Sequence, residues 1–267
     1  MRYGVGGDGE IGVIFNEGSI DMDFRVESNS YANMLFVDAG SNSVGVKTSS
    51  PASYLATEFV IGCDDEGGMT LAALSGSTKQ NIYFADGTSG SARNRGNLSY
   101  DHVDDSLSMG TASGSARFLM DNTGAVTLPS QPAFSVNPAS SQADIAVATL
   151  VTIVFGTEVF DVGSNFASNT FTAPVTGKYQ LNLALRLEST DSASNYYQIR
   201  FLTSNRSYVI SFDIGGLSGD PMLWSEAFSV LADMDASDTV SIAIYQASGT
   251  AQVDIHPETY FTGFLAC

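Results

Sequence analysis

The chain has 267 residues, of which 43% are hydrophobic, so it is long enough and apolar enough to bury a sizeable core. Aspartate and glutamate total 29 against 11 lysines and arginines, and the net charge of −18 divides equally on the two sides of Leu128. An acidity this evenly spread excludes nucleic acid as an expected partner, and no apolar run approaches the roughly 20 residues needed for membrane insertion.

Residues 1–128 are predicted to form short strands separated by turns rich in glycine, serine, asparagine and aspartate. Apolar residues alternate with others at 11–15, 22–26, 34–37 and 81–84. A unit at 36–46, with two apolar residues, an aspartate, a turn and a further strand, recurs imperfectly at 119–128. Strands this short bury little apolar area within one chain. We therefore expect three copies of the chain to share an interior here, as a homotrimer.

Three features of the chain could indicate a catalytic or nucleotide-binding site, but we do not expect any of them to form one. Gly4-Val-Gly-Gly-Asp-Gly9 matches the dinucleotide fingerprint, but only three residues precede it and no helical pattern follows. His102 and His256 lie in acidic segments, and no nucleophile-elbow sequence accompanies them. Cys63 and Cys267 are far apart, which predicts free thiols and assembly in a cytoplasm. No secretory leader is recognisable. We expect a protein that is not an enzyme.

The N-terminal units also carry a resemblance. Asp23-Phe-Arg-Val-Glu-Ser28, the segment 36–52 and the segment 97–107 resemble the repeats of bacteriophage tail-fibre shafts. This resemblance implies a trimeric β-rich shaft at the distal end of a virion tail fibre, with other virion tail proteins as partners.

Pro129, Pro132 and Pro138 mark a change in pattern, which predicts two domains, 1–128 and 129–267. The strands expected in the second domain are longer and more apolar, and their regular spacing predicts an antiparallel β-sandwich. They are residues 133–136, 146–154, 169–172, 179–187, 196–202, 208–214, 227–232, 240–245 and 260–265.

A second resemblance lies in this domain. Phe160-Asp-Val-Gly163, Phe166 and the segments 170–179, 132–136, 236–240 and 260–265 resemble the complement globular-head family within the tumour-necrosis-factor-like jelly rolls. The resemblance implies an all-β chain that ends in an antiparallel jelly-roll head and assembles as a trimer. Leucines 181 and 183 stand where that family usually has aromatic residues. The positions it implies for head core or trimer packing are Phe171, Tyr179, Leu181, Leu183, Phe261 and Phe264.

Candidate receptor-binding residues lie in or beside the loops 189–195 and 215–223. They are Tyr196, Tyr197, Trp224 and Asp220, because aromatic faces beside polar groups suit both sugar rings and protein loops. Tyr197 and Trp224 have an alternative role as core or subunit-interface residues.

Asp233, Asp235 and Asp238 are weak candidates for a metal site. The expected state is a solvated turn without any cofactor, because their spacing differs from that of known calcium loops. The alternative is a ring of carboxylates, repeated by threefold symmetry, that binds calcium.

Together these features predict a phage tail-fibre-like receptor-binding protein, a trimeric adhesin whose head binds a host cell-surface glycan or protein. One alternative is a purely structural cap that registers the trimer without receptor contact. A hydrolase acting on host polysaccharide is a third class, which the sparse inventory of catalytic residues disfavours.

Overall fold

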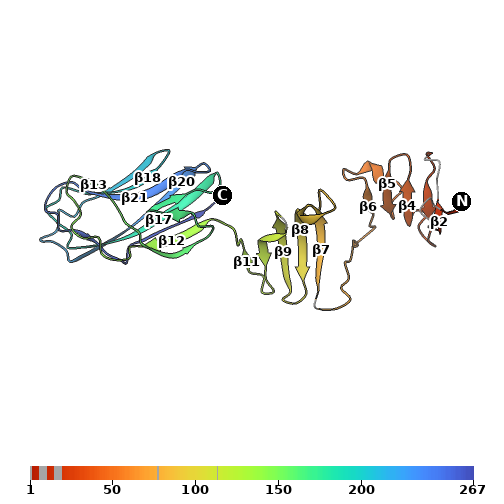
Figure 1. The fold of residues 1–267 in the computed structure, drawn as a ribbon, viewed down its shortest axis with the longest axis horizontal. Coiled ribbons are helices and arrows are strands. Elements are labelled where there is room, and N and C mark those ends of the chain that lie inside the picture. Colours follow the sequence, from red (N-terminus) through yellow and green to blue (C-terminus); the bar gives the residue numbers. More distant parts are fainter. Residues whose placement is uncertain (1, 6–10, 15–19, 77, 113) are drawn as a thin grey trace. The chain divides into compact units, whose positions relative to one another are not determined.

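A computed structural model describes residues 2–5, 11–14, 20–76, 78–112 and 114–267. Their regular structure consists of β-strands and two 3-10 turns, η1 (Pro51–Ser53) and η2 (Gly90–Asn94), which confirms the predicted all-β class (Figure 1). None of these elements is a helix that could span a membrane. The glycines of the fingerprint beyond Gly4 lie outside the described residues.

The chain divides into two compact units, Met1–Gly76 and Ser77–Cys267. The second unit contains a five-stranded sheet that ends at Thr127 and a sandwich that begins at Ala133. The change of architecture therefore falls between these two residues, and the division into domains 1–128 and 129–267 stays a prediction.

The first unit contains a hairpin and a small sheet. Strands β1 (Arg2–Val5) and β2 (Ile11–Ile14) pair antiparallel. The sheet has the order β3-β4-β5-β6, with β5 and β6 parallel. Its strands are β3 (Phe24–Val26), β4 (Leu35–Asp38), β5 (Ser43–Val46) and β6 (Phe59–Ile61).

The five-stranded sheet is an antiparallel meander, in which each strand pairs with the next along the chain. Such a sheet has two faces because successive side chains alternate between them. Its strands are β7 (Lys79–Phe84), β8 (Gly96–Asp101), β9 (Ser106–Thr111), β10 (Ser115–Met120) and β11 (Val126–Thr127).

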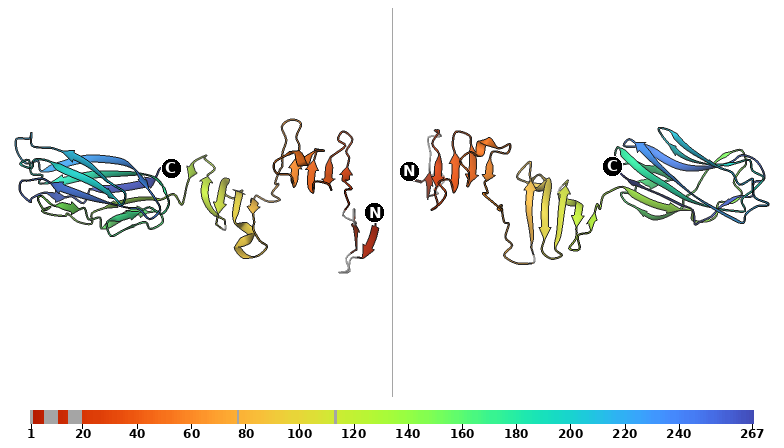
Figure 2. Two further views of the ribbon diagram at one scale, coloured as in Figure 1. Left: turned by 90° about the horizontal axis from the view of Figure 1, so that it is seen from above. Right: turned by 180° about the vertical axis from the view of Figure 1, so that it is seen from behind.

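The remaining strands form two packed sheets, seen as two layers in Figure 2. We call them the β17 sheet, with the order β14-β12-β23-β17-β20, and the β18 sheet, with the order β15-β16-β21-β18-β19. The chain passes repeatedly from one sheet to the other, which is the antiparallel jelly-roll arrangement. The β17 sheet contains β12 (Ala133–Asn137), β14 (Thr157–Asp161), β17 (Gly177–Glu188), β20 (Leu223–Met234), β22 (Asp254–Ile255) and β23 (Tyr260–Leu265). The β18 sheet contains β13 (Leu150–Thr152), β15 (Phe166–Ala167), β16 (Thr170–Thr172), β18 (Tyr197–Thr203), β19 (Ser207–Phe212) and β21 (Thr239–Gln246).

An aromatic cluster fills one end of the sandwich core. The ring of Phe134 stacks on that of Phe171, with centroids 4.6 Å apart, and meets Phe261 edge-on at 4.9 Å. Gly263 lets this cluster approach the β17 sheet, because a Cβ there would lie 2.6 Å from the Phe134 ring. The alternation Tyr179, Leu181, Leu183, Leu185, Leu187 places five fully buried side chains of β17 against the same core.

The segment 146–154 differs from its prediction. Only Leu150–Thr152 forms a strand there, and Val147 contributes an isolated bridge to Gln246. Asp144 and Ala148 adopt left-handed backbone angles, with φ of 52° and 53°. These angles turn the chain out of the extended conformation, so the apolar run before Leu150 becomes an irregular cover over the end of the sandwich.

Candidate binding surfaces

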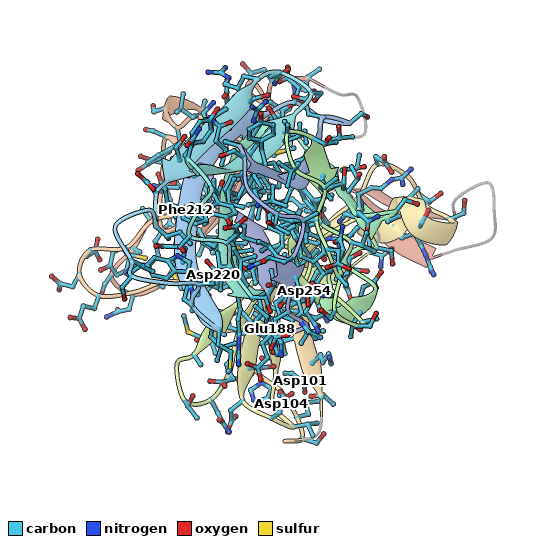
Figure 3. All side chains as sticks on the ribbon, turned by 90° about the vertical axis from the view of Figure 1, so that its left-hand side faces the viewer. Asp101, Asp104, Glu188, Phe212, Asp220 and Asp254 are labelled. Atoms are coloured by element: carbon cyan, nitrogen blue, oxygen red, sulfur yellow. The ribbon has the colours of Figure 1, made fainter. Side chains whose placement is uncertain are left out.

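Three loops at one end of the sandwich are tied together by a single exposed carboxylate. They are residues 189–196, 213–222 and 247–253. One oxygen of Asp220 accepts hydrogen bonds from the main-chain N–H and hydroxyl of Ser192, at 2.9 and 2.6 Å, and the other accepts one from the Gln252 amide at 2.9 Å. Asp220 is one of the side chains labelled in Figure 3. The Ser192 hydroxyl is the main cause that lowers the pKa of Asp220 below its ordinary value. The loops therefore form one fixed surface.

A second aspartate, beneath the surface, joins two of these loops, 189–196 and 247–253. Asp191 is buried, and its carboxylate accepts hydrogen bonds from the N–H groups of Thr250 and Ala193. Its main-chain carbonyl accepts a hydrogen bond of 2.7 Å from the Tyr197 hydroxyl. The fixed donors compensate for burying the charge.

The four predicted receptor-binding residues differ in how deeply they are buried. Tyr197 is fully buried, stacks on Phe212 with centroids 5.3 Å apart, and has its pKa raised far above the ordinary value by burial. Trp224 is half-buried and packs against the core. Tyr196 and Asp220 lie at the surface, with Tyr196 38% exposed.

The six predicted packing residues divide in a similar way. Five of them are fully buried in the sandwich core, whereas Phe264 is 45% exposed on the outer face of the β17 sheet. The five buried residues are Phe171, Tyr179, Leu181, Leu183 and Phe261.

The outer face of the β18 sheet carries a cluster of which sequence reasoning identified only Tyr196. The Arg200 guanidinium lies 5.8 Å from the centre of the Tyr245 ring, and the Tyr196 ring lies 6.1 Å from that of Tyr245. The Gln198 side-chain oxygen accepts hydrogen bonds from two guanidinium nitrogens of Arg200, at 3.2 and 2.7 Å. The alternation of buried Ile199 and Phe201 around Arg200 is the sequence signal that could have placed it on this face.

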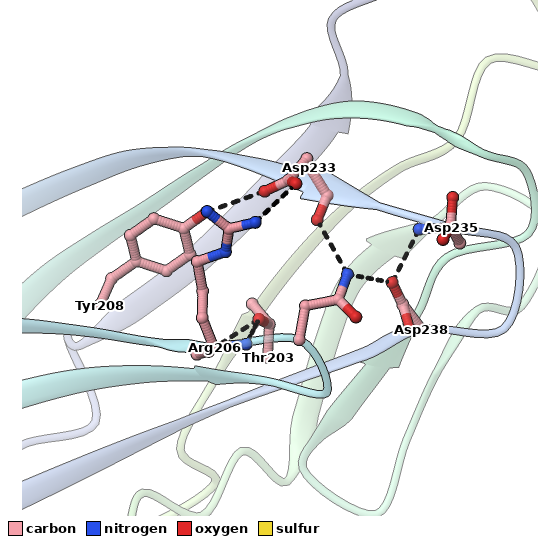
Figure 4. A network of polar contacts seen from close by, with 7 residues as sticks. Thr203, Arg206, Tyr208, Asp233, Asp235 and Asp238 are labelled. Atoms are coloured by element: carbon pink, nitrogen blue, oxygen red, sulfur yellow. Dashed lines mark hydrogen bonds and ion pairs between the residues drawn. The ribbon is translucent and has the colours of Figure 1, made fainter.

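The predicted metal candidates belong to a polar network (Figure 4). This network lies at the end of the sandwich opposite to the loops that Asp220 joins. Asp233 pairs with Arg206 at 2.7 Å. Asp238 accepts hydrogen bonds from the Ser204 hydroxyl and the Asn205 amide, both at 2.6 Å, and the hydroxyl is the main cause that lowers its pKa. Asp235 is exposed, and its main-chain N–H donates to Asp238 at 2.7 Å.

This network gives the carboxylates of Asp233 and Asp238 partners from within the chain. In the described part of the chain, no three His, Cys, Asp or Glu side chains are grouped so that they could hold a metal ion. Calcium bound between copies on a threefold axis stays a prediction.

The two histidines have amide, carboxylate and main-chain partners. His102 lies 3.0 Å from the Gln80 side-chain oxygen. One ring nitrogen of His256 accepts a hydrogen bond from the Glu258 N–H at 3.0 Å, and the other lies 3.5 Å from Glu188. Among the residues that the structure describes, neither ring contacts a hydroxyl or thiol in the manner of a nucleophilic triad.

Comparison with known proteins gives matches only among solved structures. No family model and no curated protein matches the chain. The globular domain of zebrafish complement 1qA is 19% identical, covers 51% of this chain and 98% of its own, and has a TM-score of 0.40. Two structures of murine APRIL, at pH 8.0 and pH 8.5, are each 13% identical with the same coverage, and have TM-scores of 0.38 and 0.36.

Proposed function

We propose that the chain is a trimeric attachment protein, the receptor-binding part of a phage tail-fibre-like assembly on a virion. In this proposal the N-terminal sheets join three copies, and the sandwich contacts a glycan or protein of the host surface. The observation that carries the proposal is that two sheets of the chain each expose an apolar face.

The five-stranded sheet is apolar on one face and more polar on the other. Its register places Ile82, Leu98, Met109 and Phe118 side by side across four strands. The neighbouring row on the same face holds Tyr100, Leu107, Met120 and Val126. The opposite face carries Asn81, Asn97, Ser99 and Ser108 together with Tyr83 and Leu119.

The apolar side of this sheet remains largely accessible to solvent in a single chain. Ile82 is 40% exposed, Met109 47% and Val126 50%. Large contiguous apolar surfaces on soluble proteins mark contacts with other molecules, and a single-layer sheet gains little stability unless such a face is covered.

The sheet of the first unit repeats this pattern. Val26, Leu35, Val46 and Ile61 form one row, and Val37, Val44 and Phe59 lie on the same face. Val60, which points to the other face, and Pro51 are the buried apolar side chains among the described residues of this unit. Copies of the chain supply a matching apolar surface for each sheet.

The sandwich offers a third surface for self-association. Tyr260, Phe264 and Leu231 are exposed on the outer face of the β17 sheet, beside a central network in which the Gln180 amide and the Ser229 hydroxyl both donate to Asn182. An apolar surface with satisfied polar groups is typical of subunit interfaces. The number three comes from the two resemblances, which imply the same symmetry for both parts of the chain.

The first test is the mass of the particle in solution. Light scattering should give three times the chain mass of 28.1 kDa. Met109→Asp places a charge on the apolar face and should shift the mass toward that of one chain, whereas Ser108→Asp, on the opposite face, should leave it unchanged. A stable, cooperatively unfolding single chain would overturn the trimer, and so would a dimer.

The second test separates attachment from a purely structural cap. Alanine substitutions within 189–195 and 216–223, made at exposed positions, should abolish adsorption to host cells while the mass stays that of the trimer. If the protein still adsorbs to host cells after every loop substitution and every substitution on the outer face of the β18 sheet, the result supports the purely structural cap.

A further inference from the structure

Charge is distributed unequally between the two layers of the sandwich. The strands of the β17 sheet contain six carboxylates and two cations. The six strands of the β18 sheet, all within the described range 114–267, contain a single charged residue, Arg200. This arginine therefore lies on a face that is free of negative charge, in a chain whose net charge is −18.

Arg200 differs from the other arginines of the sandwich in what it contacts. Arg186 pairs with Glu258, and Arg206 pairs with Asp233. Arg200 is instead held by the neutral amide of Gln198 and lies near the Tyr245 ring. Neither contact neutralises its charge, so the guanidinium keeps the capacity to bind an anion.

The surroundings of Arg200 are flat and aromatic. The Tyr196 and Tyr245 rings are tilted by 32° to each other, and Tyr196 is 38% exposed. Across the register, Leu150 lies opposite Tyr245, Val209 opposite Arg200 and Ser211 opposite Gln198. The exposed Tyr196 ring and the half-buried Tyr245 ring, beside an amide, a hydroxyl and a cation, offer stacking for the C–H face of a sugar and hydrogen bonds for its hydroxyls.

We propose that the outer face of the β18 sheet binds a carboxylate-bearing sugar of a host surface polysaccharide, with Arg200 holding the carboxylate and Tyr245 and Tyr196 packing against the sugar ring. This inference rests on the proposed attachment function and specifies the chemical class of its ligand. The surface is the flank of the sandwich, and of its three named residues only Tyr196 also belongs to the loops that Asp191 and Asp220 fix.

The ligand chemistry follows from having one cation beside two rings. A polysaccharide with one carboxylate in each repeat presents a single charge and an apolar sugar face to the site. An acidic peptide carries comparable charge but lacks the apolar sugar face against which the two rings can pack. Repulsion from the rest of the chain does not prevent sugar binding, because salt screens charges beyond about 8 Å at physiological ionic strength.

The test uses the full chain in its assembled state and an array of acidic polysaccharides. Polygalacturonate, alginate and a sialic acid polymer are each compared with their carboxyl-reduced forms, and poly-L-glutamate represents an acidic peptide. We expect each bound polysaccharide to lose at least tenfold in affinity when its carboxyl groups are reduced, which corresponds to about 1.4 kcal/mol.

Matched variants identify the site. Arg200→Gln should weaken binding tenfold or more, and Arg206→Gln, which removes the same charge elsewhere in the sandwich, should not. Tyr245→Ala should weaken binding, whereas Tyr245→Phe keeps the ring and should preserve it. Val209→Glu places a carboxylate beside an intact Arg200 and should abolish binding, with Val209→Gln as its control. Light scattering and melting temperature verify that each variant is assembled and folded.

The outcomes distinguish this inference from the proposed function. The proposal of an acidic-sugar ligand is overturned if the reduced polymers or poly-L-glutamate bind as well as the acidic polysaccharides. It is also overturned if Arg200→Gln binds as well as the parent, or if no polymer binds. The attachment function survives these results if the trimer adsorbs to host cells through other residues, and it fails if no adsorption is found.

Discussion

Two aspartates at the loop end of the sandwich have different structural roles. Asp191 is 3% exposed, and its carboxylate is the acceptor for two main-chain N–H groups from different loops. Asp220 is exposed and accepts from Ser192 and Gln252. The first supports the loops from within, and the second joins them at the surface.

Replacing Asp191 should destabilise the sandwich. In Asp191→Ala the N–H groups of Thr250 and Ala193 lose their acceptor in a buried place, which we expect to cost about 2–4 kcal/mol of unfolding free energy. Urea denaturation followed by tryptophan fluorescence measures the change. Asp235→Ala, an exposed position, should stay within about 0.5 kcal/mol of the parent. Equal stability of both variants would contradict the role given to Asp191.

Asp220 should make the loops sensitive to acid. Its hydrogen bonds lower its pKa in the folded state, so its contribution is present above the ordinary carboxyl pKa of 3.8 and is lost as the pH falls through the lower folded value. Melting temperatures recorded from pH 6 to pH 2 should fall less steeply at the acid end for Asp220→Asn than for the parent. Parallel curves would show that this carboxylate is not linked to folding.

At this scale the sequence identified some residues and missed others for a physical reason. Asp220 and Tyr196 were predicted from their place in polar loops, and both lie at the surface. Asp191, within Ser-Thr-Asp-Ser, resembles an ordinary solvated turn, and only the fold shows that Thr250 covers it. Arg200 could be placed on an outer face by alternation, but its nearness to Tyr245 depends on a strand pairing between distant segments.

At the scale of elements, strand prediction succeeded where one face of a strand is buried. The alternating segment 179–187 is the centre of β17, which extends over Gly177–Glu188. Strand β14 was missed, because four of its five residues, Thr157 to Phe160, are exposed and its sequence has no alternation. Position 148, where the expected strand 146–154 is broken, is occupied by alanine, which does not mark a left-handed turn as glycine would.

The turn after β21 depends on one glycine. Gly249 has a φ of 92°, and a Cβ at this position would lie against the Asp191 carboxylate. Gly249→Ala should therefore cost about 1–3 kcal/mol through backbone strain and displacement of Asp191. Gly219→Ala, in the neighbouring loop with no atom within 4 Å of the new Cβ, is the matched control. Thermal unfolding of the two variants side by side measures the difference.

For the whole molecule, the proposed sharing of apolar faces between copies makes stability depend on assembly. Because an associating species is favoured by mass action, the melting temperature of the intact protein should rise with its concentration. Scanning calorimetry over a hundredfold concentration range measures this dependence. Met109→Asp, which should dissociate the copies, should remove the dependence, and Ser108→Asp should retain it. A concentration-independent melting temperature in the parent would contradict an assembly held by these faces.

In the proposed attachment, the uneven placement of charge in the sandwich affects how the protein approaches a host surface. One layer holds six strand carboxylates with two cations, and the other holds one cation alone, so each head has an electric dipole moment across its thickness. On the proposed host, the field of a negatively charged envelope would exert a torque on this dipole and turn the Arg200 flank toward the surface. Since ions screen the field over about 8 Å, the reorientation is confined to the last nanometre before contact, and raising the salt concentration should slow productive landing without loosening the fold.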